Sequence, residues 1–180
     1  MEEPTKVQLA SPQDISDEDF LSPSRDIVLP SLPENVLSAV GSIAKPVMIK
    51  RNVFAKNIRN HTELTVDDSR KILNAALTIP DLAINDKPSA KASYWVLVNV
   101  DGKNAIVTID VDINKETIEV VGWRWAREKS LEQIKKRAFN EGGQVLITSV
   151  GAAGLSALKE STPVFSNSKS TKDYEKMQEV

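Results

Sequence analysis

Residues 92–129, ASYWVLVNVDGKNAIVTIDVDINKETIEVVGWRWAREK, decide the fold. The dipeptide Asp101-Gly102 separates two runs in which apolar and polar residues alternate, a pattern typical of a β-hairpin. It predicts that residues 94–100 pair antiparallel with residues 103–111. A third run rich in Val, Ile and Trp covers residues 117–125 and follows a second short turn. The whole stretch therefore predicts a three-stranded β-meander.

Helical signals precede the meander. Phe54, Ile58 and His61 are spaced so that they share one face of a helix. The segment from Thr65 to Asp68 is a variant capping box, which predicts the start of a second helix that ends at Pro80.

Two more strands and a third helix are predicted around this centre. Residues 45–50 predict an edge strand, because Pro46 lacks an N–H group. After the meander, a capping box at Ser130 predicts a helix that ends near Gly142, and residues 144–150 predict the last strand. The expected fold class is α+β, with N-terminal helices packed on a four-stranded antiparallel sheet of meander, helix and last strand.

The beginning of the chain differs in composition from the rest. Residues 1–35 carry eight acidic and two basic residues, a net charge of −6, and the remaining residues carry +4. Residues 1–44 are also rich in Pro and Ser, so we expect a mostly extended acidic leader. Deletion of residues 1–30 should then cost little stability. Residues 45–150 form the expected domain, and residues 151–180 a polar tail with a weak helix.

Several function classes lack support in the sequence. The chain has no cysteine, so thiolate metal sites and disulfides are excluded, and no His/Asp cluster has metal-ligand spacing. No Walker loop, Gly-rich dinucleotide turn or Gly-x-Ser-x-Gly motif occurs. No secretory signal and no apolar run near the roughly 18 residues of a membrane span is found. We therefore expect no metal, no cofactor and no membrane partner.

His61 is the only histidine, so imidazole chemistry near neutral pH can come only from this residue. Its position at the end of a helix allows two interpretations. It is either an acid–base group, or a hydrogen-bonded residue that the negative end of the helix dipole stabilises.

Basic and aromatic residues suggest a phosphate-bearing partner. One basic stretch surrounds Lys56 and Arg59, and another surrounds Arg124 and Arg127. These stretches could bind a phosphate backbone or could be solvated faces. In Trp123-Arg124-Trp125 both indoles point to one side of a strand and the guanidinium to the other. We expect one indole in the core, while the other could stack on a base.

The segment KNIRNHTELTVDDSRKILNAALTIPDLAI, followed by a polar loop, the meander, a helix and a strand, resembles a known family. It is similar to phage-associated nuclease-like domains of the barnase–EndoU–colicin–RelE (BECR) group, over roughly residues 46–150. The residues that carry the resemblance are Lys56, His61, Glu63, Leu64, Leu77, Pro80 and Asp81.

The resemblance implies a metal-independent endoribonuclease, in a toxin or effector domain of a phage or mobile element. In such a reaction the RNA 2′-hydroxyl attacks its own phosphate while a base takes the proton, an acid protonates the leaving oxygen and cations stabilise the transition state. The candidate catalytic residues are His61, Lys56, Arg124 and Thr148, with Ser149 as the alternative hydroxyl and Glu63 or Glu128 as a second acid–base group. The candidate RNA-binding residues are Arg59, Trp125 and Arg127.

A second hypothesis is a catalytically inactive interaction or structural protein of a phage or mobile element. The expected partners are RNA, a protein partner, or the acidic leader acting as a self-inhibitor. The expected location is the cytoplasm, or a bacterial cytoplasm reached by phage delivery.

Overall fold

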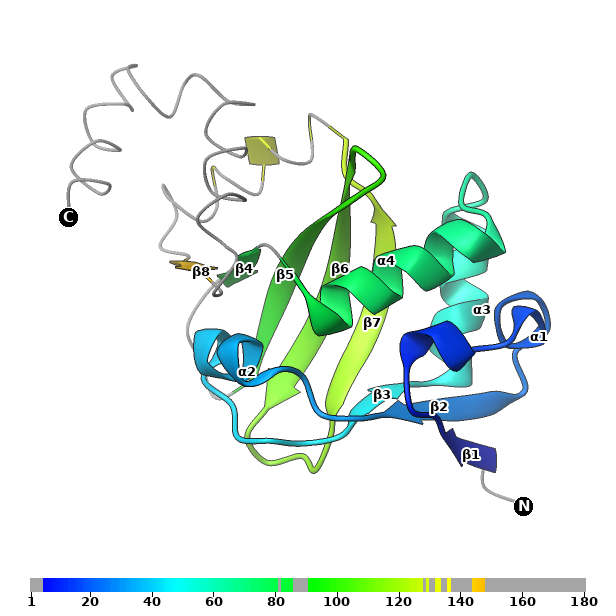
Figure 1. Ribbon diagram of the computed structural model, residues 1–180, viewed down its shortest axis with the longest axis horizontal. Helices are drawn as coiled ribbons and strands as arrows, with labels where there is room; N and C mark the ends of the chain where they lie inside the picture. The colour runs from blue at the N-terminus through cyan, green and yellow to red at the C-terminus, as the bar shows by residue number, and fades with distance from the viewer. Residues whose placement is uncertain are drawn as a thin grey trace.

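The computed structural model describes residues 5–80, 82–85, 91–127, 129, 132–133, 136 and 144–147. Its strands form one mixed sheet with the order β1-β2-β3-β7-β6-β5-β4-β8 (Figure 1). The strands are β1 Thr5–Gln8, β2 Arg25–Leu29, β3 Val47–Ile49, β4 Leu82–Asn85, β5 Lys91–Val100, β6 Lys103–Asp112, β7 Ile118–Trp125 and β8 Gln144–Ile147. The α-helices in the described residues include α1 Asp17–Leu21, α2 Glu34–Val40, α3 Arg51–Asn60 and α4 Val66–Thr78.

The predicted meander is confirmed. β5 pairs antiparallel with β6 from Lys91↔Asp112 to Val100↔Lys103. Asp101 and Gly102 form the turn with φ angles of 52° and 85°, as a two-residue turn that matches the twist of the strands requires. β7 pairs antiparallel with β6, as expected for the third strand.

The predicted helix boundaries before the meander are also confirmed. The Thr65 hydroxyl accepts from the Asp68 N–H at 2.9 Å, and the Asp68 carboxylate accepts from the Thr65 N–H at 3.1 Å. This reciprocal capping box begins α4. α3 ends at Asn60 and is capped by His61, whose N–H donates to the Asn57 carbonyl at 2.9 Å.

The predicted sheet is wrong in size and in pairing. In the described residues the sheet has eight strands, and two of its pairs, β1 with β2 and β3 with β7, are parallel. β3 is not an edge strand, because it lies between β2 and β7 and all three of its residues are buried. A short run of buried apolar residues is typical of such a central strand. β4 separates β8 from the meander, so β8 is not the meander's neighbour.

The expectation of an extended leader is also wrong for residues 5–44. This segment supplies β1, β2, α1 and α2, and its prolines lie at element boundaries, for example Pro12 at the start of a 3₁₀ turn and Pro33 before α2. Its acids take part in the fold. The Asp19 carboxylate accepts two hydrogen bonds from Arg25, at 2.9 and 3.0 Å, and the Asp26 carboxylate accepts from the Arg51 N–H at 2.9 Å.

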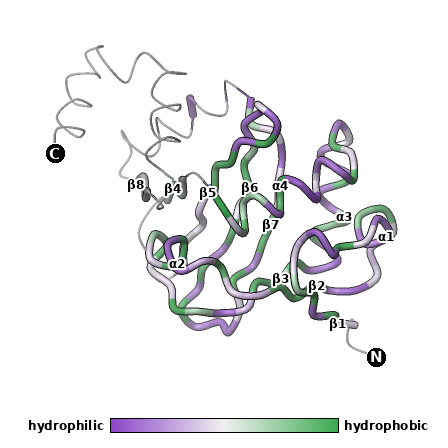
Figure 2. Tube along the Cα trace, in the orientation of Figure 1, coloured by the Kyte–Doolittle hydropathy of each residue, from purple (hydrophilic) through white to green (hydrophobic). Residues whose placement is uncertain are grey.

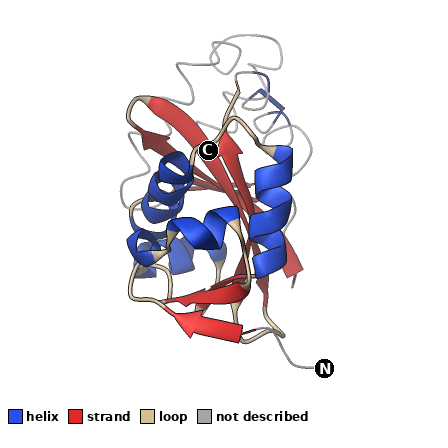
Figure 3. Ribbon diagram, turned by 90° about the vertical axis from the view of Figure 1, so that its right-hand side faces the viewer, coloured by secondary structure: helices blue, strands red, loops and turns tan. Residues whose placement is uncertain are grey.

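The core lies between the helices and one face of the sheet. Figure 1 shows α4 across the front of β5, β6 and β7, and Figure 2 shows that hydrophobic residues follow these strands. Figure 3 shows the helices gathered beside the long strands, with the short N-terminal strands crossing near their ends. The rings of Phe20, Phe54 and Trp123 pack edge to face, with centroids 5.3–6.3 Å apart. Leader, helix and meander therefore share one core.

Three predicted features lie wholly or largely outside the described residues. They are the helix after the meander, the tail of residues 151–180 and the strand residues after Ile147.

The shared core predicts that the leader is needed for stability. Phe20 is buried in the aromatic cluster, whereas its neighbour Leu21 is 67% exposed. Phe20→Ala should lower the free energy of unfolding by about 3–5 kcal/mol, because it leaves a cavity in the core. The matched Leu21→Ala should change it by less than about 0.5 kcal/mol. Urea denaturation measures both, and equal effects would show that α1 does not belong to the core.

The Asp19–Arg25 contact predicts a pH dependence. Burial raises the pKa of the Asp19 carboxyl, but hydrogen bonds from Arg25 and Ser16 outweigh burial and hold the pKa below its usual value. A lowered carboxyl pKa gives stability that is present above the unfolded-state pKa, about 3.9, and is lost as the pH falls through the folded-state pKa. The stability difference between the wild type and Asp19→Asn should thus be full at pH 7 and shrink below about pH 4. A difference that stays constant down to pH 2 would contradict this assignment.

Candidate functional site

The site is built where β7 loses its neighbouring strand. β3 pairs with β7 only at Val47↔Ile118 and Met48↔Glu119, and the chain then turns into α3. The rest of β7 therefore lies beside a helix, and its outward backbone groups need partners from side chains. Asn57 on α3 provides one, because its Oδ1 accepts from the Trp123 N–H at 2.9 Å.

Trp123 is the residue of β7 that connects this strand to the helices around the site. It is only 2% exposed, and its indole N–H donates to the Ser69 hydroxyl on α4 at 2.9 Å. The residue thus links β7 to both α3 and α4. Trp123 is the indole expected in the core.

A β-bulge shapes the same part of β7. Thr108 pairs with Gly122, but the next residue, Ile109, pairs with Val120, so Val121 is the extra residue. A bulge bends a strand and redirects its side chains, and bulges are common beside binding sites.

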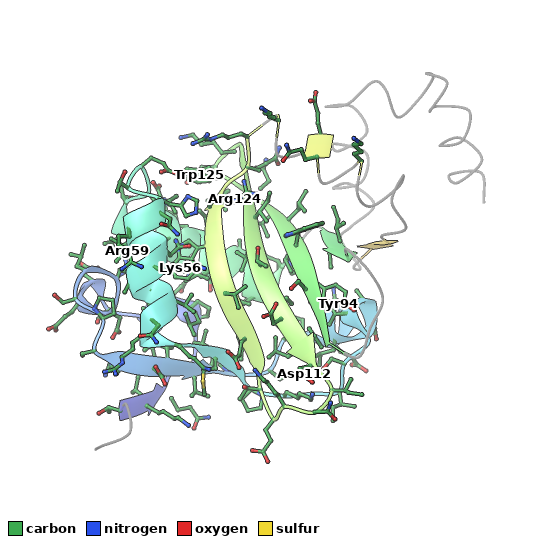
Figure 4. All side chains as sticks on the ribbon, turned by 180° about the vertical axis from the view of Figure 1, so that it is seen from behind. Lys56, Arg59, Tyr94, Asp112, Arg124 and Trp125 are labelled. Atoms are coloured by element: carbon green, nitrogen blue, oxygen red, sulfur yellow. The ribbon has the colours of Figure 1, made fainter. Side chains whose placement is uncertain are left out.

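We call the cavity between α3 and this part of β7 the polar cleft. It has a volume of about 160 Å³. Its lining residues are Lys56, Asn57, Asn60, His61, Ile106, Thr108, Val121, Gly122, Trp123 and Arg124. Three of the four predicted catalytic residues, Lys56, His61 and Arg124, therefore come together, and Figure 4 shows Lys56 on α3 near β7 and Arg124 toward the end of β7.

The polar cleft is suited to an anion. Its lining contains two permanent cations, amides and the Thr108 hydroxyl, and no carboxylate among the described residues. Burial lowers the pKa of the Arg124 guanidinium, and the nearby charge of Arg127 lowers it further. Two crowded guanidinium groups are stabilised by an anion placed near them. Arginine is also well matched to phosphate because its planar N–H groups fit two oxygens.

His61 lies at the C-terminal end of α3 with its side chain 28% exposed. Its Nδ1 is 3.7 Å from Glu63 Oε2, which is too far for a hydrogen bond but close enough for an ion pair when the imidazole is protonated. His61 therefore both caps the C-terminal end of α3 and lines the polar cleft.

A second cavity, which we call the apolar groove, adjoins the polar cleft. It has a volume of about 350 Å³ and lies among α1, α3 and the start of α4. Its lining residues are Phe20, Leu21, Asn57, Ile58, His61, Thr62, Leu64, Thr65, Val66 and Ser69. Asn57 and His61 line both cavities and form their common wall.

The other predicted site residues are placed less centrally. Arg59 is exposed on α3 and lines neither cavity, and Arg127 is exposed just after β7. Trp125 packs against the core, with the Lys103 ammonium 5.2 Å from its ring centre. Thr148, Ser149 and Glu128 lie outside the described residues. The hydroxyl that the described part of the cleft contains is Thr108, which the sequence did not indicate.

Asn57 is the main site residue that the sequence analysis missed. The available signal was an asparagine in the interior of a helix, beside the apolar Ile58, where its helix propensity is poor. Such a residue is retained when its side chain has a partner, here the Trp123 N–H.

The described residues contain no group of three His, Cys, Asp or Glu side chains that could hold a metal ion. Within the same part of the chain, no helix is both long enough and apolar enough to cross a membrane.

The leader, the helices and the meander contribute to one mixed sheet and one shared core. A family model described as "Large polyvalent protein-associated domain 13" matches residues 3–138, which cross the predicted domain boundary at residue 44. The match covers well over half of the 180 residues, so the chain belongs to this family. Comparisons with curated proteins and with solved structures give no match.

Proposed function

We propose that this domain binds RNA through the polar cleft, with the phosphate held by Lys56 and Arg124. The observation that carries the proposal is the meeting of these two cations with His61 in a cavity whose described lining has no carboxylate. Phosphate contacts from Lys and Arg supply most of the affinity in sequence-independent binding. The exposed Arg59 and Arg127 extend the positive surface along the path of the backbone.

We further propose that the bound RNA is cleaved without a metal. His61 takes the proton of the 2′-hydroxyl, the resulting oxyanion attacks the adjacent phosphorus, and the bond to the 5′-oxygen breaks. Lys56 and Arg124 stabilise the negative charge that builds on the phosphate oxygens. Glu63 supports the protonated imidazole, and the leaving oxygen takes a proton from solvent or from His61.

The family description associates this domain with large polyvalent proteins. We propose that such a protein belongs to a phage or mobile element and that the domain acts in a bacterial cytoplasm. The second candidate function is a catalytically inactive interaction module. It is favoured by the presence of one imidazole and no second acid–base side chain in the described lining of the cleft.

RNA binding is tested by removing one cation at a time. Arg124→Ala should weaken binding of a single-stranded RNA about tenfold or more, because charged hydrogen bonds contribute about 1.5–3 kcal/mol. It should also make the negative slope of log affinity against log salt concentration shallower, by about 0.7. The matched control is Lys115→Ala in the β6–β7 turn, where Glu119 keeps Lys50 as a partner. Fluorescence anisotropy at several salt concentrations measures the RNA affinity and its salt dependence for each variant. Equal losses of affinity in Arg124→Ala and Lys115→Ala would place the RNA-binding surface elsewhere.

Cleavage is tested on matched RNA and DNA strands in the presence of EDTA. The wild type should cleave RNA but not DNA, because DNA lacks the attacking 2′-hydroxyl. His61→Ala should reduce the rate by about 10²- to 10⁴-fold, the usual cost of losing an acid–base group. Thermal melting of the same sample controls for folding. Full activity per folded molecule would end the assignment of His61, and an inactive wild type that still binds RNA would favour the interaction module.

A further inference from the structure

The apolar groove and the polar cleft meet at one wall, made by the side chains of Asn57 and His61. One cavity is lined mainly by apolar groups and the other by cations and amides. A nucleotide has a similar division, since its base is uncharged, with flat faces that pack on apolar groups, while its phosphate is charged. The two cavities are therefore arranged as the two halves of a nucleotide site.

Asn57 gives the wall a directional hydrogen-bonding group. The residue is only 5% exposed, and its Oδ1 is occupied by the Trp123 N–H. This bond orients the carboxamide, so the NH₂ group is left for another partner. In the part of the chain that the structure describes, that NH₂ group has no acceptor. A buried amide donor without a partner is costly, and a ligand acceptor in the adjoining cavity would satisfy it.

The walls of the groove suit a base. Ile58, Leu64 and Val66 are partly buried and line it, and Phe20 from α1 contributes its ring. A volume of about 350 Å³ lies at the lower end of the range of roughly 300–1,000 Å³ that is usual for small-ligand pockets. Apolar walls with a few placed polar groups are the usual composition of such pockets.

We infer that the apolar groove binds the base of the nucleotide whose phosphate lies in the polar cleft, and that the Asn57 NH₂ group donates to a carbonyl or ring-nitrogen acceptor of that base. This inference rests on the proposed RNA-binding function. It assigns Asn57 as a specificity residue and makes the bound unit one nucleotide of a single-stranded RNA, since a base within a duplex is not free to enter a groove.

The test compares ligands with and without a base by isothermal titration calorimetry. The probes are inorganic phosphate and the four nucleoside 3′-monophosphates. At least one nucleotide should bind the wild type tenfold or more tightly than phosphate. Thr62→Trp, at an exposed position that lines the groove, should remove this advantage and leave phosphate binding unchanged. Ser38→Trp, exposed on α2 and outside both cavities, is the matched control and should change neither affinity.

A second variant tests the amide directly. Asn57→Asp keeps an acceptor for the Trp123 N–H but removes the NH₂ donor. Its new carboxylate should weaken phosphate binding too, so the expected result is a loss of nucleotide affinity at least tenfold larger than the loss of phosphate affinity, with thermal melting as the check on folding. If this variant does not fold, the Thr62→Trp comparison still decides the question.

The outcomes separate this inference from the proposed function. If phosphate and all four nucleotides bind equally, with binding sensitive to Arg124→Ala and not to Thr62→Trp, RNA backbone binding stands and the base site is overturned. The base site is also overturned if nucleotides bind tightly but Thr62→Trp has no effect. If neither phosphate nor nucleotide binds, both proposals fail.

Discussion

The anchoring of Trp123 is the constraint on which the rest of the structure depends. Its indole packs edge to face on Phe20 and Phe54, its N–H is bound by Asn57, and its indole N–H is bound by Ser69. These contacts attach the leader, α3 and α4 to the third strand of the meander. A buried backbone N–H on the part of β7 that β3 does not cover needs a partner, and the side chain that supplies it also forms the wall between two cavities. Stability and the candidate site therefore share the same residues.

The parts of the fold that could be predicted are those with local signals. Asp101-Gly102 between alternating runs predicted the hairpin, and the Thr65–Asp68 capping box predicted the start of α4. The parts that failed depend on distant pairing. β1 has four residues, too few to show a period, and it forms a strand because β2 lies beside it. A strand was predicted at residues 45–50, but the position of β3 between β2 and β7 depends on pairing with distant segments. The acidic charge of the leader also misled, because Asp19 and Asp26 bind groups of the fold and do not serve as a solvated tail.

The site was predictable to a similar degree. Lys56 and His61 were placed together by a helix, and Arg124 was placed opposite the indoles by strand alternation. The bulge at Val121, the Thr108 hydroxyl and the role of Asn57 required knowing that β7 has a free edge beside α3. The apolar groove could not be predicted at all, since it needs Phe20 and Leu21 from a segment that was expected to be extended. Sequence spacing predicts which residues share a face of one helix or strand. Both cavities, however, are lined by residues from more than one helix or strand, so spacing alone does not predict them.

The wall between the two cavities is the part of the molecule that we propose contacts RNA. The most direct test is to titrate ¹⁵N-labelled protein with a short single-stranded RNA and follow its NMR signals. If RNA contacts the shared wall, the largest changes should fall on the Asn57 side-chain amide, the Trp123 indole N–H and the backbone amides of His61 and Arg124, which surround this wall. Changes confined to other surfaces, such as β1 or α2, with these four signals unmoved at saturation, would contradict it.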